Sequence, residues 1–182
     1  MNEARHLWLE KGYLLFALEG PGGIRVSRMA KELARNKSAF YHYFATTEIF
    51  ISHLLDHHLV QAKGMSAQML QCQHLDDLVE TMIAHKTDLL FNRQLRVHRH
   101  HAEFETYFTQ TNSFVGDSIM PVWSKIIDLE NNPALARLVL QLSVENFFLK
   151  ATQEAFQPDW LKEYFLNVRA LVREFKASYP GQ

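Results

Sequence analysis

Aromatic and basic side chains are concentrated in one short segment near the N-terminus, and together they suit contact with a phosphate backbone. Residues 38–44 read Ser-Ala-Phe-Tyr-His-Tyr-Phe, and Lys37 precedes them. A helix exposed to solvent on all sides would carry fewer aromatic side chains, and a fully buried helix would not have cationic side chains beside them. Tyrosine, lysine and arginine side chains are common donors to phosphate oxygens of DNA. The segment therefore predicts a helix that packs one face on its own domain and lays the other on nucleic acid.

Charge is divided unevenly along the 182 residues, although the formal net charge is only −1. Residues 1–46 contain seven Lys and Arg against four Asp and Glu, whereas residues 47–182 contain twelve against sixteen. A basic N-terminal part on an acidic remainder fits a protein that brings one end to nucleic acid.

Composition points to a folded protein of a reducing compartment. The apolar content of 47% is enough for a core. The one cysteine, Cys72, excludes an intramolecular disulfide. The sequence contains no run of 18 apolar residues, and its N-terminus lacks the pattern of a secretion signal. We therefore expect a cytoplasmic protein with no membrane partner.

Hydrophobic periodicity predicts an all-α protein. Apolar residues recur at intervals of three and four, and the glycines and prolines fall mostly at breaks between such runs. In the first helix we expect Leu7, Trp8, Leu15 and Phe16 to contact the core, and Asn36 to cap the third helix. The expected helices cover residues 3–19, 27–34, 36–44, 47–71, 75–91, 95–109, 114–129, 134–156 and 159–177.

Residues 8–50 resemble the DNA-binding domain of TetR-type transcriptional regulators. The matching residues are Trp8-Leu9, Leu15-Phe16, Gly20, Met29-Ala30, Leu33, the aromatic block at 40–44 and Glu48. The resemblance implies a three-helix DNA-binding unit with a helix-turn-helix over residues 1–46. It also implies a larger helical domain for effector binding and dimerisation over residues 47–182. Such a protein would be a dimeric regulator, most often a repressor released from a palindromic operator by a small molecule.

Several positions depart from the pattern of that family. Ala34 stands where a glycine is usual in the turn, and Arg25 stands where a threonine usually opens the second helix. Thr47 replaces a lysine that often contacts phosphate. These differences suggest that Arg25, Arg28 and Lys37 supply some of the phosphate contacts.

The resemblance assigns roles to residues of the aromatic segment. Tyr41 and Tyr43 would contact the DNA backbone, and the groove-facing surface would comprise Lys37, Ser38, Ala39 and His42. The alternative is that both tyrosines merely pack the small domain and that the basic residues are solvated. Phe40 and Phe44 are expected in the core. The expected DNA-binding residues are Arg25, Arg28, Lys37, Ser38, Ala39, Tyr41, His42, Tyr43 and Thr47.

Two stripes of apolar residues near the C-terminus have helical spacing. In TetR-type regulators the last two helices pair with their copies across a two-fold axis, so the resemblance implies a homodimer. Internal packing is the alternative for each stripe. The expected interface residues are Leu135, Leu138, Leu142, Leu149, Leu161, Phe165, Val168 and Val172.

Large soft side chains are frequent in the middle of the chain, where the resemblance implies an effector pocket. A small apolar or aromatic effector would suit such a cavity, and no cofactor is expected. The alternative is an ordinary core. The expected ligand-binding residues are Phe104, Phe108, Trp123 and Phe147.

Histidines raise two other possible functions. They are grouped at His53, His57 and His58 and at His98, His100 and His101. Two histidines one helical turn apart can bind a divalent metal, so a metal-dependent enzyme or a metal sensor stays open. We expect instead a solvated basic face or a pH-sensitive patch, with no metal site, because no HExxH motif occurs and Arg96 and Arg99 are interleaved with the second group. No catalysis is expected, because motifs for nucleophile activation or phosphate cradling are missing. A helical interaction protein that has lost DNA binding is the other alternative.

Overall fold

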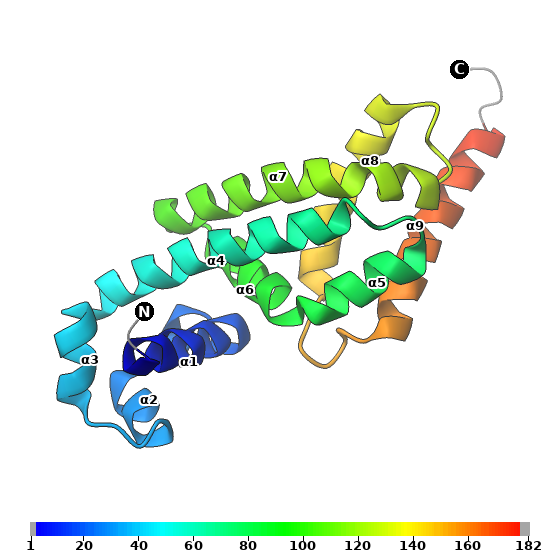
Figure 1. The fold of residues 1–182 in the computed structure, drawn as a ribbon. Helices are drawn as coiled ribbons and strands as arrows, with labels where there is room; N and C mark the ends of the chain where they lie inside the picture. Colours follow the sequence, from blue (N-terminus) through cyan, green and yellow to red (C-terminus); the bar gives the residue numbers. More distant parts are fainter. Residues whose placement is uncertain (1–2, 179–182) are drawn as a thin grey trace. The chain divides into compact units, whose positions relative to one another are not determined.

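The computed structural model describes residues 3–178, and over this range the chain is helical with no β-strand (Figure 1). This confirms the predicted all-α fold class. None of the helices in the described range is long and apolar enough to cross a membrane. The elements are α1 (Glu3–Glu19), the 3₁₀ turn η1 (Pro21–Gly23), α2 (Val26–Glu32), α3 (Lys37–Phe44), α4 (Thr47–Met69), α5 (Leu75–Ala84), α6 (Lys86–Val97), α7 (Ala102–Ile126), α8 (Pro133–Lys150) and α9 (Pro158–Ser178).

The helices form two compact units. The first unit comprises Met1–Ala62 and Thr87–Thr111, and the second comprises Lys63–Lys86 and Asn112–Gln182. The first unit therefore holds α1, α2, α3, the longer part of α4, α6 from its second residue and the beginning of α7. The second holds α5, α8, α9 and the remaining parts of α4 and α7.

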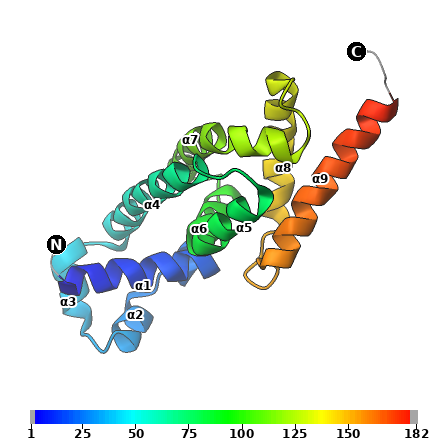
Figure 2. The same cartoon turned by 45° about the vertical axis from the view of Figure 1, so that its right-hand side comes forward.

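Aromatic stacking forms the core of the first unit, in which α2 and α3 both contact α1 (Figure 2). The rings of Trp8 and Phe40 meet edge to face at 5.4 Å, and Phe16 stacks on Phe91 at 4.3 Å. Gly12 lies against Phe50, since a Cβ at this position would come within 2.3 Å of the Phe50 ring. The glycine therefore weakens α1 locally but allows α4 to approach it closely.

Polar anchors support the apolar packing of the second unit. The Trp123 indole N–H donates to the Ala136 carbonyl at 2.8 Å, and the Tyr164 hydroxyl donates to the Ser143 carbonyl at 2.7 Å. These bonds join α7 to α8 and α8 to α9. The helices α5 and α9 also pack side by side (Figures 1 and 2).

The predicted helix boundaries were wrong in the middle of the chain. The expected helix over 75–91 is interrupted at His85, whose φ of −101° and ψ of 24° are not those of a helix. The expected helices over 95–109 and 114–129 are replaced by the end of α6 and by the continuous α7, which includes Pro121. Burial explains this continuity, because Thr111 is only 2% exposed and packing overrides the weak helix propensity of this polar stretch.

The predicted core position of Leu7 was also wrong. Leu7 is 39% exposed, because the face of α1 that carries it borders a cleft of about 500 Å³, whereas Trp8 and Phe16 are buried.

Candidate nucleic-acid interface

The helix α3 begins with a side-chain cap. The Asn36 Oδ1 accepts a hydrogen bond from the Ala39 backbone N–H at 2.9 Å, and the Ser38 hydroxyl donates to the same oxygen at 2.9 Å. This arrangement satisfies an otherwise unpaired donor of the first turn. The predicted capping role of Asn36 is confirmed.

The turn that precedes α3 has the backbone of a Schellman motif. The Arg35 N–H donates to the Ala30 carbonyl at 2.9 Å, and the Ala34 N–H donates to the Lys31 carbonyl at 3.2 Å. Ala34 has a φ of 52°, a left-handed conformation that favours glycine. The turn therefore has the backbone conformation that glycine favours, although an alanine occupies the position.

The two faces of α3 have different surroundings. Phe40 is fully buried and Phe44 is 1% exposed, which confirms both as core residues. Tyr41, whose ring meets that of Phe40 edge to face at 5.3 Å, is 50% exposed. The other residues expected on DNA are either exposed or half-buried: Lys37, Ser38 and His42 are exposed, while Ala39 and Tyr43 are half-buried. The structure thus leaves Lys37, Ser38, Tyr41 and His42 exposed on α3 while its phenylalanines anchor the helix.

Threonines shape the following turn. The Thr46 hydroxyl oxygen accepts the Ile49 N–H at 3.2 Å, so Thr46 caps α4 and Thr47 is its first residue. The Glu48 carboxylate accepts hydrogen bonds from its own backbone N–H and from the Thr46 hydroxyl, which lower its pKa. The half-buried Thr47 lies directly after the turn that ends α3.

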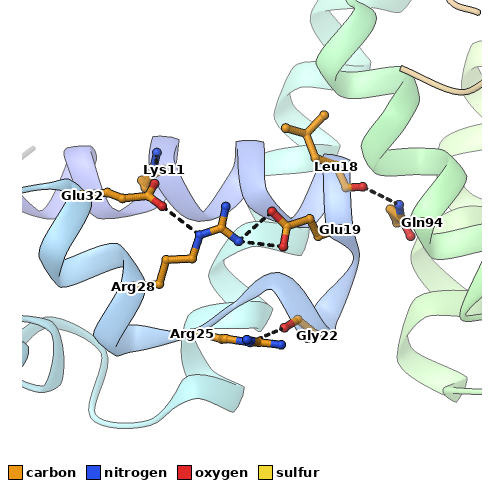
Figure 3. Close-up of polar contacts among 8 residues, drawn as sticks. All are labelled: Lys11, Leu18, Glu19, Gly22, Arg25, Arg28, Glu32 and Gln94. Carbon is orange, nitrogen blue, oxygen red and sulfur yellow. Dashed lines mark hydrogen bonds and ion pairs between the residues drawn. The ribbon is translucent and has the colours of Figure 1, made fainter. Parts of the chain in front are cut away.

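Arg28 is engaged within the first unit (Figure 3). Its Nη1 lies 2.7 Å from both carboxylate oxygens of Glu19, and its Nε donates to Glu32 Oε1 at 2.8 Å. Glu32 also pairs with Lys11. A phosphate could contact Arg28 only in competition with these carboxylates.

Arg25 has a different environment. It is exposed and precedes α2, and its Nε donates to the Gly22 carbonyl at 3.3 Å (Figure 3). This contact pairs the guanidinium with a neutral backbone oxygen and not with a carboxylate. A further cation that sequence reasoning missed is Arg5, whose guanidinium carbon lies 5.2 Å from the centre of the Phe44 ring.

A buried polar network connects three helices of the first unit. The Tyr13 hydroxyl donates to Asp88 Oδ1 at 2.7 Å and lies 2.8 Å from His58 Nδ1, while His58 Nε2 lies 3.4 Å from Asn92 Oδ1. Burial lowers the pKa of His58 to about 4 and raises that of Tyr13. His58 is 1% exposed, so its expected place on a solvated face was wrong. The sequence offered no signal for this network, because its members come from α1, α4 and α6.

The remaining histidines form no metal cluster. His100 and His101 are exposed, with ring centres 4.3 Å apart, and His98 lies beside them. Burial, and then the charges of the two neighbouring histidines, lower the pKa of His98. Within residues 3–178, no three His, Cys, Asp or Glu side chains are grouped so that they could hold a metal ion.

The four expected ligand-binding aromatics are all buried. Phe104 and Phe108 belong to the first unit, where Phe104 meets Phe16 edge to face at 5.6 Å. Trp123 and Phe147 belong to the second unit, where Phe147 packs against Phe156 and Tyr164. Each therefore has a packing role in its own unit.

The expected interface residues fall into two groups. The leucines of α8 are exposed, with Leu138, Leu142 and Leu149 at 52%, 69% and 71%; Leu135 is 37% exposed. On α9, Leu161, Phe165 and Val172 are instead buried within the chain, and Val168 is half-buried. The large exposed apolar side chains of α9 are Leu166, Leu171 and Phe175.

This combination of a capped aromatic helix after a tight turn and a larger helical body defines the TetR-like fold. A solved structure from Rhodococcus sp., described as a candidate TetR-family transcriptional regulator, superposes with a TM-score of 0.59. It covers 94% of this chain and 99% of its own length at 16% identity. No family model and no curated protein matches the sequence. The likeness therefore establishes the fold that the resemblance predicted.

Proposed function

We propose that this chain is a dimeric DNA-binding transcriptional regulator, a repressor that a small molecule releases from a palindromic operator, and not an enzyme. The observation that carries the proposal is the division of α3: Phe40 and Phe44 are buried, while Lys37 and Tyr41 are exposed. A recognition helix needs one face fixed in its domain and another free to enter the major groove. The TetR-like fold supports the same function. Such a protein acts in the cytoplasm, where its operator lies.

Residues 1–46 would form the DNA-binding domain in this proposal. Lys37, Ser38, Ala39 and His42 would face base edges in the groove. The phosphate backbone would be contacted by Arg25, Arg28, Tyr41, Tyr43 and Thr47, and Lys37 at the start of α3 would also reach it. Arg28 would contribute less than the others, because Glu19 and Glu32 already neutralise it.

Residues 47–182 would bind the effector and the second copy of the chain. The exposed apolar side chains of α8 and α9 support dimerisation, since an extensive exposed apolar surface marks an interaction site. Two linked copies of the DNA-binding domain would also explain the recognition of a palindrome. For the effector, the buried Ser66 hydroxyl supports a ligand, because it has no hydrogen-bond partner among the described residues.

The decisive experiment starts from the purified full-length protein and fragmented DNA of its own genome. Sequencing of the retained fragments should yield one palindromic motif, and binding to that motif should weaken steeply as salt rises. Retention of random fragments only, or none at low ionic strength, would contradict the proposal. Release of the motif by a small molecule would then identify the effector.

A further inference from the structure

The hydroxyl group of Ser38 is held in one orientation by the residue that caps α3. The Ser38 Oγ lies 2.9 Å from Asn36 Oδ1, and the Ala39 backbone nitrogen lies 2.9 Å from the same oxygen. A backbone N–H can only donate a hydrogen bond, so the Asn36 atom that faces it is the amide oxygen and not the amide nitrogen. The cap itself therefore fixes which way the Asn36 side chain is turned.

The orientation of the Asn36 amide determines where the Ser38 proton lies. An amide oxygen only accepts hydrogen bonds, whereas a serine hydroxyl has one proton to donate and two lone pairs that accept. The 2.9 Å contact therefore requires Ser38 to donate its proton to Asn36. The Ser38 oxygen has no second proton to give, so towards any other partner it is an acceptor.

The Ser38 oxygen is accessible to such a partner. Ser38 is exposed and is the second residue of α3, and Asn36 before the helix is exposed as well. In helix-turn-helix proteins the first residues of the recognition helix contact base edges in the major groove. Under the proposed function, on which this inference rests, Ser38 therefore presents an acceptor to a base.

The four bases differ in whether they can donate to that acceptor. In the major groove adenine presents its N6 amino group and cytosine its N4 amino group, whereas guanine O6 and N7 and thymine O4 are acceptors. A keto oxygen opposite the Ser38 oxygen would bring two acceptors together with no proton between them. A hydroxyl held by Asn36 thus discriminates amino bases from keto bases, while a freely rotating hydroxyl suits either.

We propose that Ser38 acts only as a hydrogen-bond acceptor and selects adenine or cytosine at one base pair of each half-site. Asn36 is the positioning residue, because it takes the Ser38 proton. The Ser38 oxygen then accepts a hydrogen bond from the exocyclic amino group of the selected base. Each base pair carries one such amino group in the major groove, on one strand only, so the contact also fixes the orientation of that pair.

The test measures binding of the full chain to its palindromic motif by fluorescence anisotropy after single amino groups are removed. At each base pair of the two half-sites in turn, purine replaces adenine or 2-pyrimidinone replaces cytosine. At one position per half-site, the replacement should weaken binding of the natural protein at least about fivefold more than binding of Ser38→Ala. Equal losses in the two proteins at every position would overturn the proposal.

Variants at position 36 test how the selectivity arises. At the position coupled to Ser38, the base pair is inverted so that its amino group moves to the other strand, and the ratio of the two affinities is measured for each variant. Asn36→Asp keeps a capping oxygen that accepts the Ser38 proton, so it should keep the ratio of the natural protein although its added charge weakens both complexes. Asn36→Ala releases the proton, and its ratio should fall at least about threefold. An unchanged ratio in Asn36→Ala would overturn the role of Asn36.

These ratios separate recognition from stability. Loss of the cap lowers the folded fraction of Asn36→Ala, but it lowers the apparent affinity for both operators equally and leaves their ratio unaltered. Failure of the proposed function also has a different signature. A protein that retains no motif from its own genome contradicts both proposals, whereas a protein that binds its motif without any position coupled to Ser38 contradicts only the assignment of Ser38.

Discussion

The Tyr13 hydroxyl on α1 and the Asp88 carboxylate on α6 form a 2.7 Å hydrogen bond across 75 positions of sequence. Both residues are buried, and the same hydroxyl lies against His58 of α4. A hydroxyl that donates its one proton to Asp88 must accept from His58, so His58 carries its proton on Nδ1 in this arrangement. The bond thus links three helices through a single side chain.

Replacement of Tyr13 by phenylalanine should therefore destabilise the fold. The substitution keeps the ring but leaves Asp88 and His58 without this partner, and an unsatisfied buried group costs about 1–3 kcal/mol. The matched control is Tyr107→Phe, which removes a 2.8 Å hydrogen bond to Asp56 in a more exposed setting and should cost less than about 1 kcal/mol. Urea unfolding measures both, and equal losses would contradict the importance of burial.

Stability should fall in acid because of His58. Its pKa is about 4 in the folded chain, mainly through burial, against 6.5 for an ordinary histidine. Between these pH values His58 is protonated in the unfolded chain but stays neutral in the folded chain. The free energy of unfolding therefore decreases as the pH falls through this window, and it levels off below it. The whole difference between the two pKa values of His58 corresponds to a loss of about 3 kcal/mol in the free energy of unfolding.

The pH dependence can be assigned with adjacent histidines. Unfolding free energies measured from pH 7.5 to 4 should decline less steeply in His58→Gln than in the natural sequence. His57→Gln changes the neighbouring, more exposed ring and is the matched control for loss of a histidine from α4. Parallel curves for His58→Gln and the natural sequence would show that His58 is protonated in the folded state as readily as in the unfolded one.

Local signals in the sequence predicted the N-terminal part well. The break after Glu19, the Asn36 cap and the helix end at Phe44 each depend on residues within a few positions of one another. The buried and exposed faces of α3 likewise follow from helical spacing alone. These features are local, and the structure reproduces them.

Tertiary context decides what the sequence could not show. Leu161 and Leu149 look equivalent in an apolar stripe, yet Leu161 is fully buried while Leu149 is 71% exposed. Periodicity identifies an apolar face but not which neighbour covers it. The pairing of Arg28 with Glu19, and the burial of His58, likewise depend on helices that meet only in the fold.

Replacement of Ala34 by glycine should stabilise the chain. Ala34 has a φ of 52° at the end of α2, where a side chain is disfavoured by about 1 kcal/mol. The matched control is Ala67→Gly on an exposed position of α4, where glycine should destabilise by about 0.5–1 kcal/mol. Thermal unfolding of the two variants should therefore shift in opposite directions, and a loss of stability in Ala34→Gly would contradict the strain assigned to this turn.

Two cations near the proposed interface should differ in their effect on DNA binding. Lys37 is exposed at the start of α3, so Lys37→Ala should reduce the slope of log affinity against log salt by about 2 for a dimer. Arg28→Ala should change this slope less, because its ion pairs with Glu19 and Glu32 already occupy the guanidinium. Fluorescence anisotropy at several salt concentrations measures both slopes. A larger change for Arg28 than for Lys37 would mean that the ion pairs open on DNA.

Dimerisation should depend on the exposed leucines of α8. A carboxylate at position 142 would be buried without a partner in an interface formed by this face, so Leu142→Glu should convert the dimer to a monomer. The position is 69% exposed in the single chain, and the substitution should therefore leave the fold intact. Val60→Glu on α4 is the matched control, since Val60 is 65% exposed in the other unit and should keep the dimer. Light scattering after size-exclusion chromatography gives the mass of each variant. If Leu142→Glu remains dimeric, or if the natural protein is a monomer at micromolar concentration, this face is not the interface.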